Sequence, residues 1–294
     1  MTQPDPNQLP YSELIILCGP PRSGTTWLNR ELCNMPTAFP FLPECTFLTQ
    51  QIELYHRAKR YSDRQRVEAY FSSEQNMLAY FRANVAKLID QAARFNPKID
   101  ARTLVLKDPG ICFYLMDLKD LLPIHKLVVL VRDPRDVLAS MKNVMAKKQR
   151  KWDVSVATEE LLNYYYQIGN HRQRVENDCI FVRYEDIVIG QCAALQDFLK
   201  LQLPLAAAEA SGDGIATVRK CLDSSDPFFS ELYLQPTTAA KVGSFTKMLT
   251  RKEIRHIETV CAAIIRQWDY PLTHSVRFVI SSIIRGRHMT KVLE

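Results

Sequence analysis

The residues best suited to chemistry form one short string near the N-terminus, Gly19-Pro20-Pro21-Arg22-Ser23-Gly24-Thr25-Thr26-Trp27. This string follows an apolar run at residues 13–18 and leads into an amphipathic stretch, which predicts a strand, a glycine-rich turn and a helix. The backbone N–H groups at such a helix start point outward, and the helix dipole adds partial positive charge there. The sequence therefore predicts an anion-binding loop in which Arg22 supplies a cationic side chain.

The loop differs from the P-loop of nucleotide triphosphatases at one position. Its spacing imitates G-x-x-x-x-G-K-[ST], but Thr25 stands where that motif requires a lysine. Without the lysine, the β- and γ-phosphates of ATP lose their main cationic partner. A P-loop kinase or other nucleotide phosphotransferase is therefore an alternative that the loop disfavours.

A second candidate phosphate site is formed by Arg132 and Ser140, far from the loop in sequence. Arg132 ends an apolar run at residues 127–131, and Asp133 and Pro134 then suit the N-cap and first positions of a helix. Ser140 falls two turns into that helix. Both side chains can face the carboxyl end of a parallel sheet, where open α/β folds bind ligands and a guanidinium binds phosphate strongly.

Taken together, these two strings resemble the nucleotide site of sulfotransferases that use 3′-phosphoadenosine 5′-phosphosulfate (PAPS). The resemblance implies that Arg22 contacts the phosphosulfate and that Arg132 and Ser140 bind the 3′-phosphate. It also implies further contacts within the loop, to the 5′-phosphate or adenine, from Pro21, Ser23, Gly24, Thr25, Thr26 and Trp27. A place in the core is an equal alternative for Trp27.

Two shorter strings follow in the order that the family has. The string Arg183-Tyr184-Glu185-Asp186 resembles the segment in which the family places a tyrosine near adenine, which implies that role for Tyr184. The string from Lys241 to Phe245 resembles the late segment that closes over the 3′-phosphate, which implies contacts from Lys241 and Gly243. The resemblance covers nearly the whole chain, and it implies PAPS as sulfuryl donor and PAP as product.

Sulfuryl transfer requires a base for the acceptor hydroxyl, cations beside the transferred group and in-line geometry. The cytosolic branch of the family supplies a histidine two residues after a strand-ending lysine. Lys107 matches that lysine, but Pro109 occupies the histidine position. A second branch, which includes tyrosylprotein and several carbohydrate sulfotransferases, uses a glutamate that follows the phosphate loop. The resemblance to this branch implies that Glu44 is the base and that Lys107 and Arg22 stabilise the sulfuryl group.

Glu44 has aromatic neighbours in sequence, Phe41 and Phe47, so we expect a desolvated carboxylate with a raised pKa. The alternative for Glu44 is to cap a helix that begins near Cys45. Asp108 is predicted to cap a helix and is a weaker candidate for the base. No metal ion is implied by any of these residues.

Short apolar runs alternate with amphipathic stretches along the chain. This pattern predicts an α/β fold of the P-loop-containing nucleotide-binding type, with a central parallel β-sheet flanked by helices. Strands are expected at residues 13–18, 104–106, 127–131 and 180–182, and helices at 25–34 and from 134 onward. A helical insertion at residues 47–100 is expected to line the acceptor site. A capping box at Thr250 and Glu253 predicts a final helix with one apolar stripe as far as Trp268.

The composition, 47% hydrophobic and 24% charged over 294 residues, suits a substantial core, and we expect a single domain, 1–294, with a flexible N-terminus at residues 1–11. The net charge of +6 suits an anionic ligand, and no nucleic-acid-binding motif is present. The eight cysteines form no C-x-x-C pair, which indicates reduced thiols. No signal peptide or bilayer-spanning run is visible, so we expect a cytoplasmic protein.

The acceptor is a hydroxyl compound, and the sequence does not choose among a sugar, a phenol and a tyrosyl peptide. We expect residues 211–235 to form a lid. The apolar tail at 276–284, with basic residues around it, suits a docked helix or a homodimer contact better than a membrane contact. A non-catalytic PAP-binding protein is a further alternative, against which the joint retention of Glu44, Lys107 and Arg132 argues.

Overall fold

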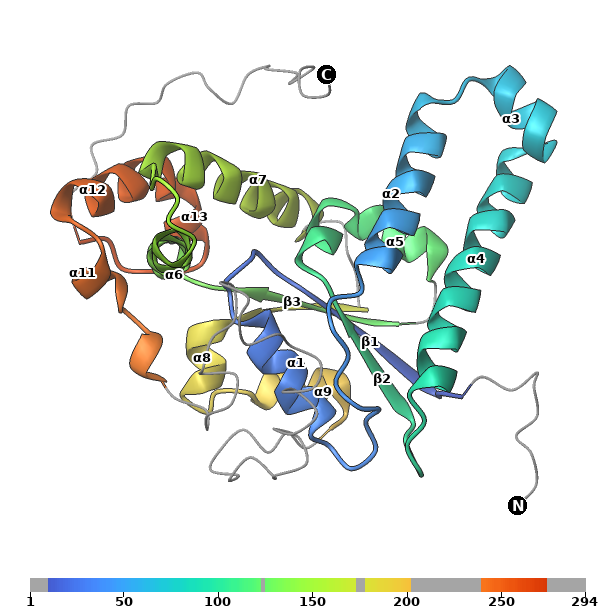
Figure 1. The fold of residues 1–294 in the computed structure, drawn as a ribbon, viewed down its shortest axis with the longest axis horizontal. Coiled ribbons are helices and arrows are strands. Elements are labelled where there is room, and N and C mark those ends of the chain that lie inside the picture. The colour runs from blue at the N-terminus through green and yellow to red at the C-terminus, as the bar shows by residue number, and fades with distance from the viewer. Residues whose placement is uncertain (1–9, 123–124, 173–177, 202–238, 274–294) are drawn as a thin grey trace.

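The computed structural model describes residues 10–122, 125–172, 178–201 and 239–273 (Figure 1). Within this part of the chain, one sheet contains four parallel strands in the order β2-β1-β3-β4. The strands are β1 (Glu13–Cys18), β2 (Thr103–Lys107), β3 (Lys126–Val131) and β4 (Cys179–Arg183). The predicted α/β fold with a parallel sheet is confirmed, and all four strands lie where the apolar runs predicted them.

Side chains of the central strand alternate between two cores, one on each face of the sheet. Leu14 and Ile16 of β1 belong to one core, whereas Ile15 and Leu17 belong to the other. Three of these four side chains are fully buried, which explains why the strand is almost continuously apolar. Each such side chain contributes about 1.5–3 kcal/mol through its burial.

Helices cover both faces of the sheet (Figure 1). The smaller layer contains α1 (Thr25–Cys33), α8 (Tyr184–Val188) and α9 (Ala193–Leu199). The larger layer contains α2 (Thr46–Tyr61), α3 (Arg64–Phe71), α4 (Glu74–Phe95), α5 (Leu115–Leu121), α6 (Pro134–Lys147), α7 (Val154–Arg172), α11 (Phe245–Met248), α12 (Arg251–Val260) and α13 (Ala262–Gln267). Two short 3₁₀ helices, η1 (Pro109–Phe113) and η3 (Ala239–Lys241), precede α5 and α11.

The expected helical insertion consists of α2, α3 and α4, which project together from one end of the sheet (Figure 1). Asp63 caps α3 by accepting from Arg66 N, and Ser73 caps α4 by accepting from Asn76 N. The apolar stripe of α4 is buried at Phe81, among other positions. Side-chain caps and this stripe explain why the segment is helical and why it packs back on the body.

The C-terminal helix begins at the predicted capping box, in which Thr250 and Glu253 cap each other. The prediction of one continuous helix is wrong, because the chain leaves helical geometry at Cys261, between α12 and α13. Cys261 N still donates to Ile257 O (2.7 Å), and Ile265 N donates to Cys261 O (2.9 Å). The apolar stripe therefore remains buried across the break.

No helix among the described residues combines the length and the apolar character that crossing a bilayer requires. The expected lid at residues 211–235, the tail at 276–284 and most of the expected flexible N-terminus lie outside the described residues.

Candidate functional site

The sheet topology places the candidate residues along one edge. Gly19 follows β1, Lys107 ends β2, Arg132 follows β3, and Tyr184 follows β4. Because the four strands are parallel, their carboxyl ends lie at the same edge of the sheet. Residues from four separate sequence strings therefore meet at one place.

The phosphate loop depends on two glycines for its close packing. At Gly19 a Cβ atom would lie 2.1 Å from Leu130 O, and at Gly24 it would lie 2.6 Å from Tyr184 Cδ2. Gly24 also has φ 102°, a left-handed conformation that disfavours other residues, and α1 begins directly after it. The loop can therefore approach the sheet and Tyr184 only because glycine occupies these two positions.

The phosphate loop contains one buried polar atom of interest, the hydroxyl oxygen of Ser23. Ser23 N donates to Pro20 O (3.0 Å), and the Ser23 side chain is fully buried. Within the described part of the chain, Ser23 Oγ is one of a few buried side-chain atoms without a hydrogen-bond partner. The first N–H groups of α1 likewise have no acceptor inside their own helix. These donors suit an anion at the start of α1.

The structure joins the two predicted phosphate sites directly. Arg22, with φ 69°, directs Nε to Ser140 Oγ at 3.1 Å. Arg132 Nη1 donates to the Arg22 carbonyl oxygen (3.2 Å). Hydrogen bonds therefore connect the phosphate loop both with Arg132 and with Ser140 of α6.

Arg132 is a buried cation beside the phosphate loop, since it is 7% exposed. Its guanidinium stacks on the Tyr184 ring, 4.5 Å from the centroid, and its Nη2 donates to Lys241 O (2.8 Å). Arg132 Nε is buried and, among the described groups, has no hydrogen-bond partner. The Trp27 ring packs edge-on against Tyr184 with centroids 5.6 Å apart, inside the smaller core. Trp27 is thus a core residue that also borders the candidate nucleotide site.

Sequence reasoning missed Asp136, which holds the segment of Lys241 and Gly243 in place. Its carboxylate accepts hydrogen bonds from Gly243 N (2.8 Å), Ser244 Oγ (3.1 Å) and Phe245 N (2.9 Å). Burial raises the pKa of Asp136, an effect that Arg132 and the two N–H donors oppose. The available signal was a second aspartate in the first turn of a helix that Asp133 already caps.

The candidate catalytic pair, Lys107 and Glu44, is in direct contact. Lys107 Nζ donates to Glu44 Oε1 (2.6 Å) and to Thr26 Oγ1 (3.2 Å). The Cys45 backbone N donates to Lys107 O (2.9 Å), which fixes the Glu44 segment to the end of β2. One ammonium group therefore connects the phosphate loop with the carboxylate.

The expected desolvation of Glu44 is wrong. Its side chain is 51% exposed, and its neighbour in sequence, Phe47, is itself 74% exposed and does not cover it with a buried aromatic ring. The alternative role as a helix cap is not found either, since Cys45 is the N-cap residue of α2 and no side chain caps that end. Glu44 is an accessible carboxylate held by Lys107.

Asp108 has a different environment, since it is 6% exposed. It caps η1, as predicted, by accepting from Gly110 N (2.6 Å). Burial raises the pKa of Asp108, and the negative charge of Glu44 adds to that effect. The Asp108 carboxylate therefore serves the backbone of η1, which weakens its candidacy as the base.

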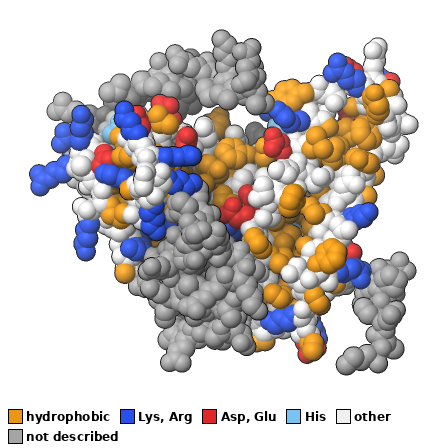
Figure 2. Space-filling view, in the orientation of Figure 1, with side chains coloured by type: hydrophobic (Ala, Val, Ile, Leu, Met, Phe, Trp, Pro, Cys, Tyr) orange, Lys and Arg blue, Asp and Glu red, His pale blue; other side chains and the backbone are white. Residues whose placement is uncertain are grey.

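Aromatic side chains lie beside this pair of carboxylates. Phe113 of η1 and Tyr164 of α7 pack with ring centroids 4.6 Å apart. Burial, together with nearby acidic groups that include Asp108 and Glu44, raises the pKa of Tyr164 to about 12. Figure 2 shows further hydrophobic side chains over the projecting helices α2–α4, where Leu54, Tyr70 and others are exposed.

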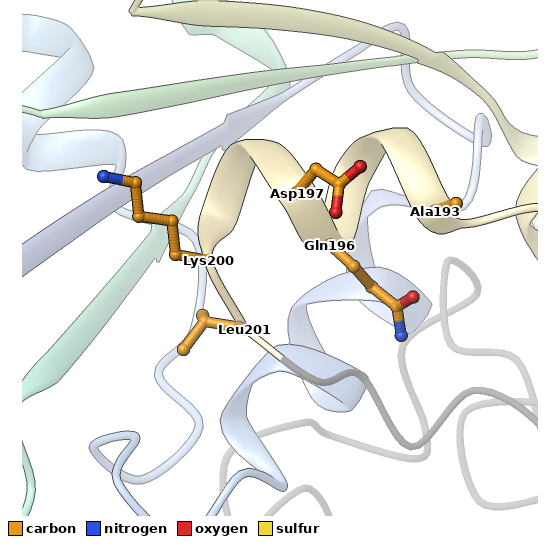
Figure 3. A pocket seen from close by; sticks show the side chains of 5 residues that line it. All are labelled: Ala193, Gln196, Asp197, Lys200 and Leu201. Atoms are coloured by element: carbon orange, nitrogen blue, oxygen red, sulfur yellow. The ribbon is translucent and has the colours of Figure 1, made fainter.

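A pocket of about 330 Å³ on α9 is unrelated to this edge. It is lined by Ala193, Gln196, Asp197, Lys200 and Leu201 (Figure 3). The Lys200 and Gln196 side chains point in opposite directions, so its polar groups do not converge on one ligand. We therefore assign it no chemistry.

Comparisons with known proteins agree with this geometry. Two solved structures align over most of their length. The sulfotransferase domain from the curacin biosynthetic pathway has 18% identity and a TM-score of 0.56, covering 89% of this chain and 99% of that one. The sulfotransferase domain of the Synechococcus PCC 7002 olefin synthase has 17% identity and a TM-score of 0.57, covering 92% and 99%. At these identities the likeness concerns the fold. Comparison with curated protein sequences finds no match.

The family comparison covers more than half of the sequence. A family model described as "Sulfotransferase family" matches residues 14–205, from β1 to just beyond α9. This span includes the phosphate loop, Glu44, Lys107 and Arg132. The chain therefore belongs to the sulfotransferase family.

Proposed function

We propose that this chain transfers the sulfuryl group of PAPS to an acceptor hydroxyl, with Glu44 as the general base. The observation that carries the proposal is that two buried polar atoms, Ser23 Oγ and Arg132 Nε, have no hydrogen-bond partner among the described residues. An unsatisfied buried donor costs about 1–3 kcal/mol, so both atoms favour a ligand that supplies acceptors. They lie at the phosphate loop and at the end of β3, which suits a nucleotide with phosphates at both its 5′ and 3′ positions.

The proposed binding roles follow from these positions. The loop from Pro21 to Thr26 would hold the 5′-phosphosulfate through N–H groups and hydroxyls, with Arg22 as a cationic partner. Arg132 and Ser140 would bind the 3′-phosphate, and Lys241 and Gly243 would approach it from the other side. Trp27 and Tyr184 would border the adenine. When bound, PAPS supplies an activated sulfuryl group on a phosphate leaving group.

In the proposed reaction the acceptor hydroxyl loses its proton to the Glu44 carboxylate as its oxygen forms a bond to sulfur. The bond between sulfur and the bridging phosphate oxygen breaks in line, and PAP leaves with that electron pair. Lys107 would stabilise negative charge on the transferred group and the bridging oxygen. The exposure of Glu44 supports this role, because an acceptor must be able to reach the base.

Two alternatives are weaker on structural grounds. A P-loop kinase needs a lysine at the position that Thr25 occupies here. Thr25 is 4% exposed and its side chain provides only a hydroxyl group. A non-catalytic PAP-binding protein has no use for the contact between Lys107 and Glu44. The catalytic proposal explains both the phosphate-binding groups and this contact.

The decisive experiment incubates the purified chain with ³⁵S-labelled PAPS and separate panels of sugar, phenol and tyrosyl-peptide acceptors. We expect labelled product in at least one panel, and we expect PAP to raise the melting temperature more than ATP with Mg²⁺ does. Arg132→Ala should abolish the shift with PAP, whereas Arg172→Ala, which alters a guanidinium stacked on Trp268, should retain it. A melting temperature that rises with ATP and Mg²⁺ but not with PAP would favour the kinase. Binding of PAP without transfer to any acceptor would favour the non-catalytic protein.

We further propose that the helical insertion lines the acceptor site, because α2 begins two residues after Glu44 and contacts η1. The described cysteines are all free thiols, which supports a cytoplasmic location. A homodimer and the lack of nucleic-acid binding stay predictions from the sequence.

A further inference from the structure

One buried carboxylate near the proposed nucleotide site has no role in the reaction described above. Asp136 lies in the first turn of α6 and is 1% exposed. The capping of that helix does not need it, because Asp133 already accepts from Arg135 N (2.9 Å). Burying a carboxylate is costly unless several donors compensate it. A buried carboxylate at this position therefore suggests a role other than helix capping.

The donors to Asp136 come from three consecutive residues of one distant segment. Gly243 N binds Oδ2 at 2.8 Å, while Ser244 Oγ and Phe245 N bind Oδ1 at 3.1 and 2.9 Å. Gly243 has φ 70°, so the chain makes a left-handed turn at this point. A single side chain thus holds the turn that precedes α11.

Arg132 holds the other end of the same segment. Its Nη2 donates to Lys241 O at 2.8 Å, and its guanidinium also lies 3.9 Å from the Asp136 carboxylate. Arg132 and Asp136 are four residues apart, at the start of α6. Together they bind residues 241–245, and Arg132 Nε has no hydrogen-bond partner in the part of the chain that the structure describes.

We infer that Asp136 is a positioning residue for the nucleotide, which holds residues 241–245 against Arg132 so that the 3′-phosphate is enclosed. This inference rests on the proposed function of Arg132, Lys241 and Gly243. Asp136 itself does not contact the nucleotide. Its effect should therefore be specific to ligands that carry a 3′-phosphate.

The alternative is that Asp136 only joins α6 to α11 and stabilises the fold. The two roles differ in what they predict for PAP, which has a 3′-phosphate, and for AMP, which lacks one. Loss of a positioning residue weakens PAP binding selectively. Loss of a structural contact lowers the melting temperature and leaves the ratio of the two affinities unchanged.

The experiment measures PAP and AMP affinities by calorimetry for the full chain and for Asp136→Asn, which keeps the shape but cannot accept all three hydrogen bonds. We expect the Kd for PAP to rise about tenfold or more, the Kd for AMP to change less than threefold, and kcat at saturating PAPS to stay within threefold. Glu253→Gln is the matched control. Glu253 also fixes α6 to the C-terminal helices, through Lys142 at 2.9 Å, but lies outside the proposed nucleotide site.

Glu253→Gln should lower stability and leave the ratio of PAP to AMP affinity unchanged. The inference is overturned if Asp136→Asn binds PAP like the original chain, or weakens PAP and AMP equally. If Asp136→Asn does not fold, Ser244→Ala replaces it, because this change removes only one of the three hydrogen bonds. A selective loss of about threefold then supports the inference, and an unchanged ratio overturns it. If the original chain does not bind PAP at all, the proposed function itself fails.

Discussion

Lys107 Nζ lies 2.6 Å from Glu44 Oε1, although the Lys107 side chain is 3% exposed and the Glu44 side chain is 51% exposed. The pair therefore spans the boundary between the protein interior and the solvent. The same ammonium is 3.2 Å from Thr26 Oγ1 of the phosphate loop. A cation in this position can stabilise charge on the donor side while the carboxylate remains open to the acceptor.

Replacing Lys107 with alanine should lower kcat at least a hundredfold, because removal of one preorganised charge-stabilising group costs about 2.7–4 kcal/mol in the barrier. PAP should still raise the melting temperature, since Arg132 and the loop are unchanged. Lys126→Ala is the control, because Lys126 begins β3 at the opposite end of the sheet. Turnover within tenfold of the original chain would remove Lys107 from the mechanism.

Replacing Glu44 with glutamine should also lower kcat at least a hundredfold, because an amide cannot accept the hydroxyl proton. Glu53→Gln, at another accessible acid on α2, should retain full activity. Near-normal turnover in Glu44→Gln would exclude Glu44 as the general base and favour Asp108 in that role.

Gly24→Ala should abolish PAP binding, because the added Cβ would lie 2.6 Å from Tyr184 Cδ2 in a left-handed backbone conformation. Gly190→Ala is the control that distinguishes a steric clash from backbone strain. Gly190 also has a left-handed backbone, with φ 87°, but an added Cβ would meet no atom of the described residues within 4 Å. We expect the control to lose about 1–2 kcal/mol of stability and to bind PAP normally. Thermal melts with and without PAP measure both effects, and normal binding by Gly24→Ala would contradict the packing argument.

Glu253 should make stability depend on pH in the acid range. Burial raises its pKa, but hydrogen bonds from Thr250, Lys142 and Trp152 outweigh that effect and lower the pKa to about 2 from an ordinary 4.5. The ionised form is thus favoured by folding, so its contribution is complete above pH 4.5 and is lost as the pH falls toward 2. The difference in melting temperature between the original chain and Glu253→Gln should shrink over that window. A constant difference would contradict this assignment.

The acceptor should not carry a negative charge. Glu44 and Asp108 are acidic, and Glu160 lies one helical turn before Tyr164 on α7. Among matched phenols, kcat/KM should be highest for tyramine, intermediate for 4-ethylphenol and lowest for 3-(4-hydroxyphenyl)propionate, with about tenfold between the extremes. Glu160→Gln should narrow that range. A preference for the propionate would contradict the expected electrostatics.

The sheet and the phosphate loop can be predicted from the order of residues alone, because both depend on local patterns. Apolar runs such as residues 13–18 are typical of buried parallel strands, and Gly24 before Thr25 indicates the turn that opens α1. Contacts between distant segments were beyond that reasoning. Aromatic neighbours in sequence predict a buried Glu44, whereas in the fold both Glu44 and Phe47 are exposed.

Contacts between side chains that are distant in sequence are visible only in the folded chain. From the sequence, Asp136 is only an acidic residue in the first turn of a helix. In the fold it accepts hydrogen bonds from residues 243–245, more than a hundred residues away. The break at Cys261 likewise has no local breaker such as proline or glycine. Burial and hydrogen bonding at such positions depend on partners that chain folding brings together, which no periodicity or spacing along the sequence contains.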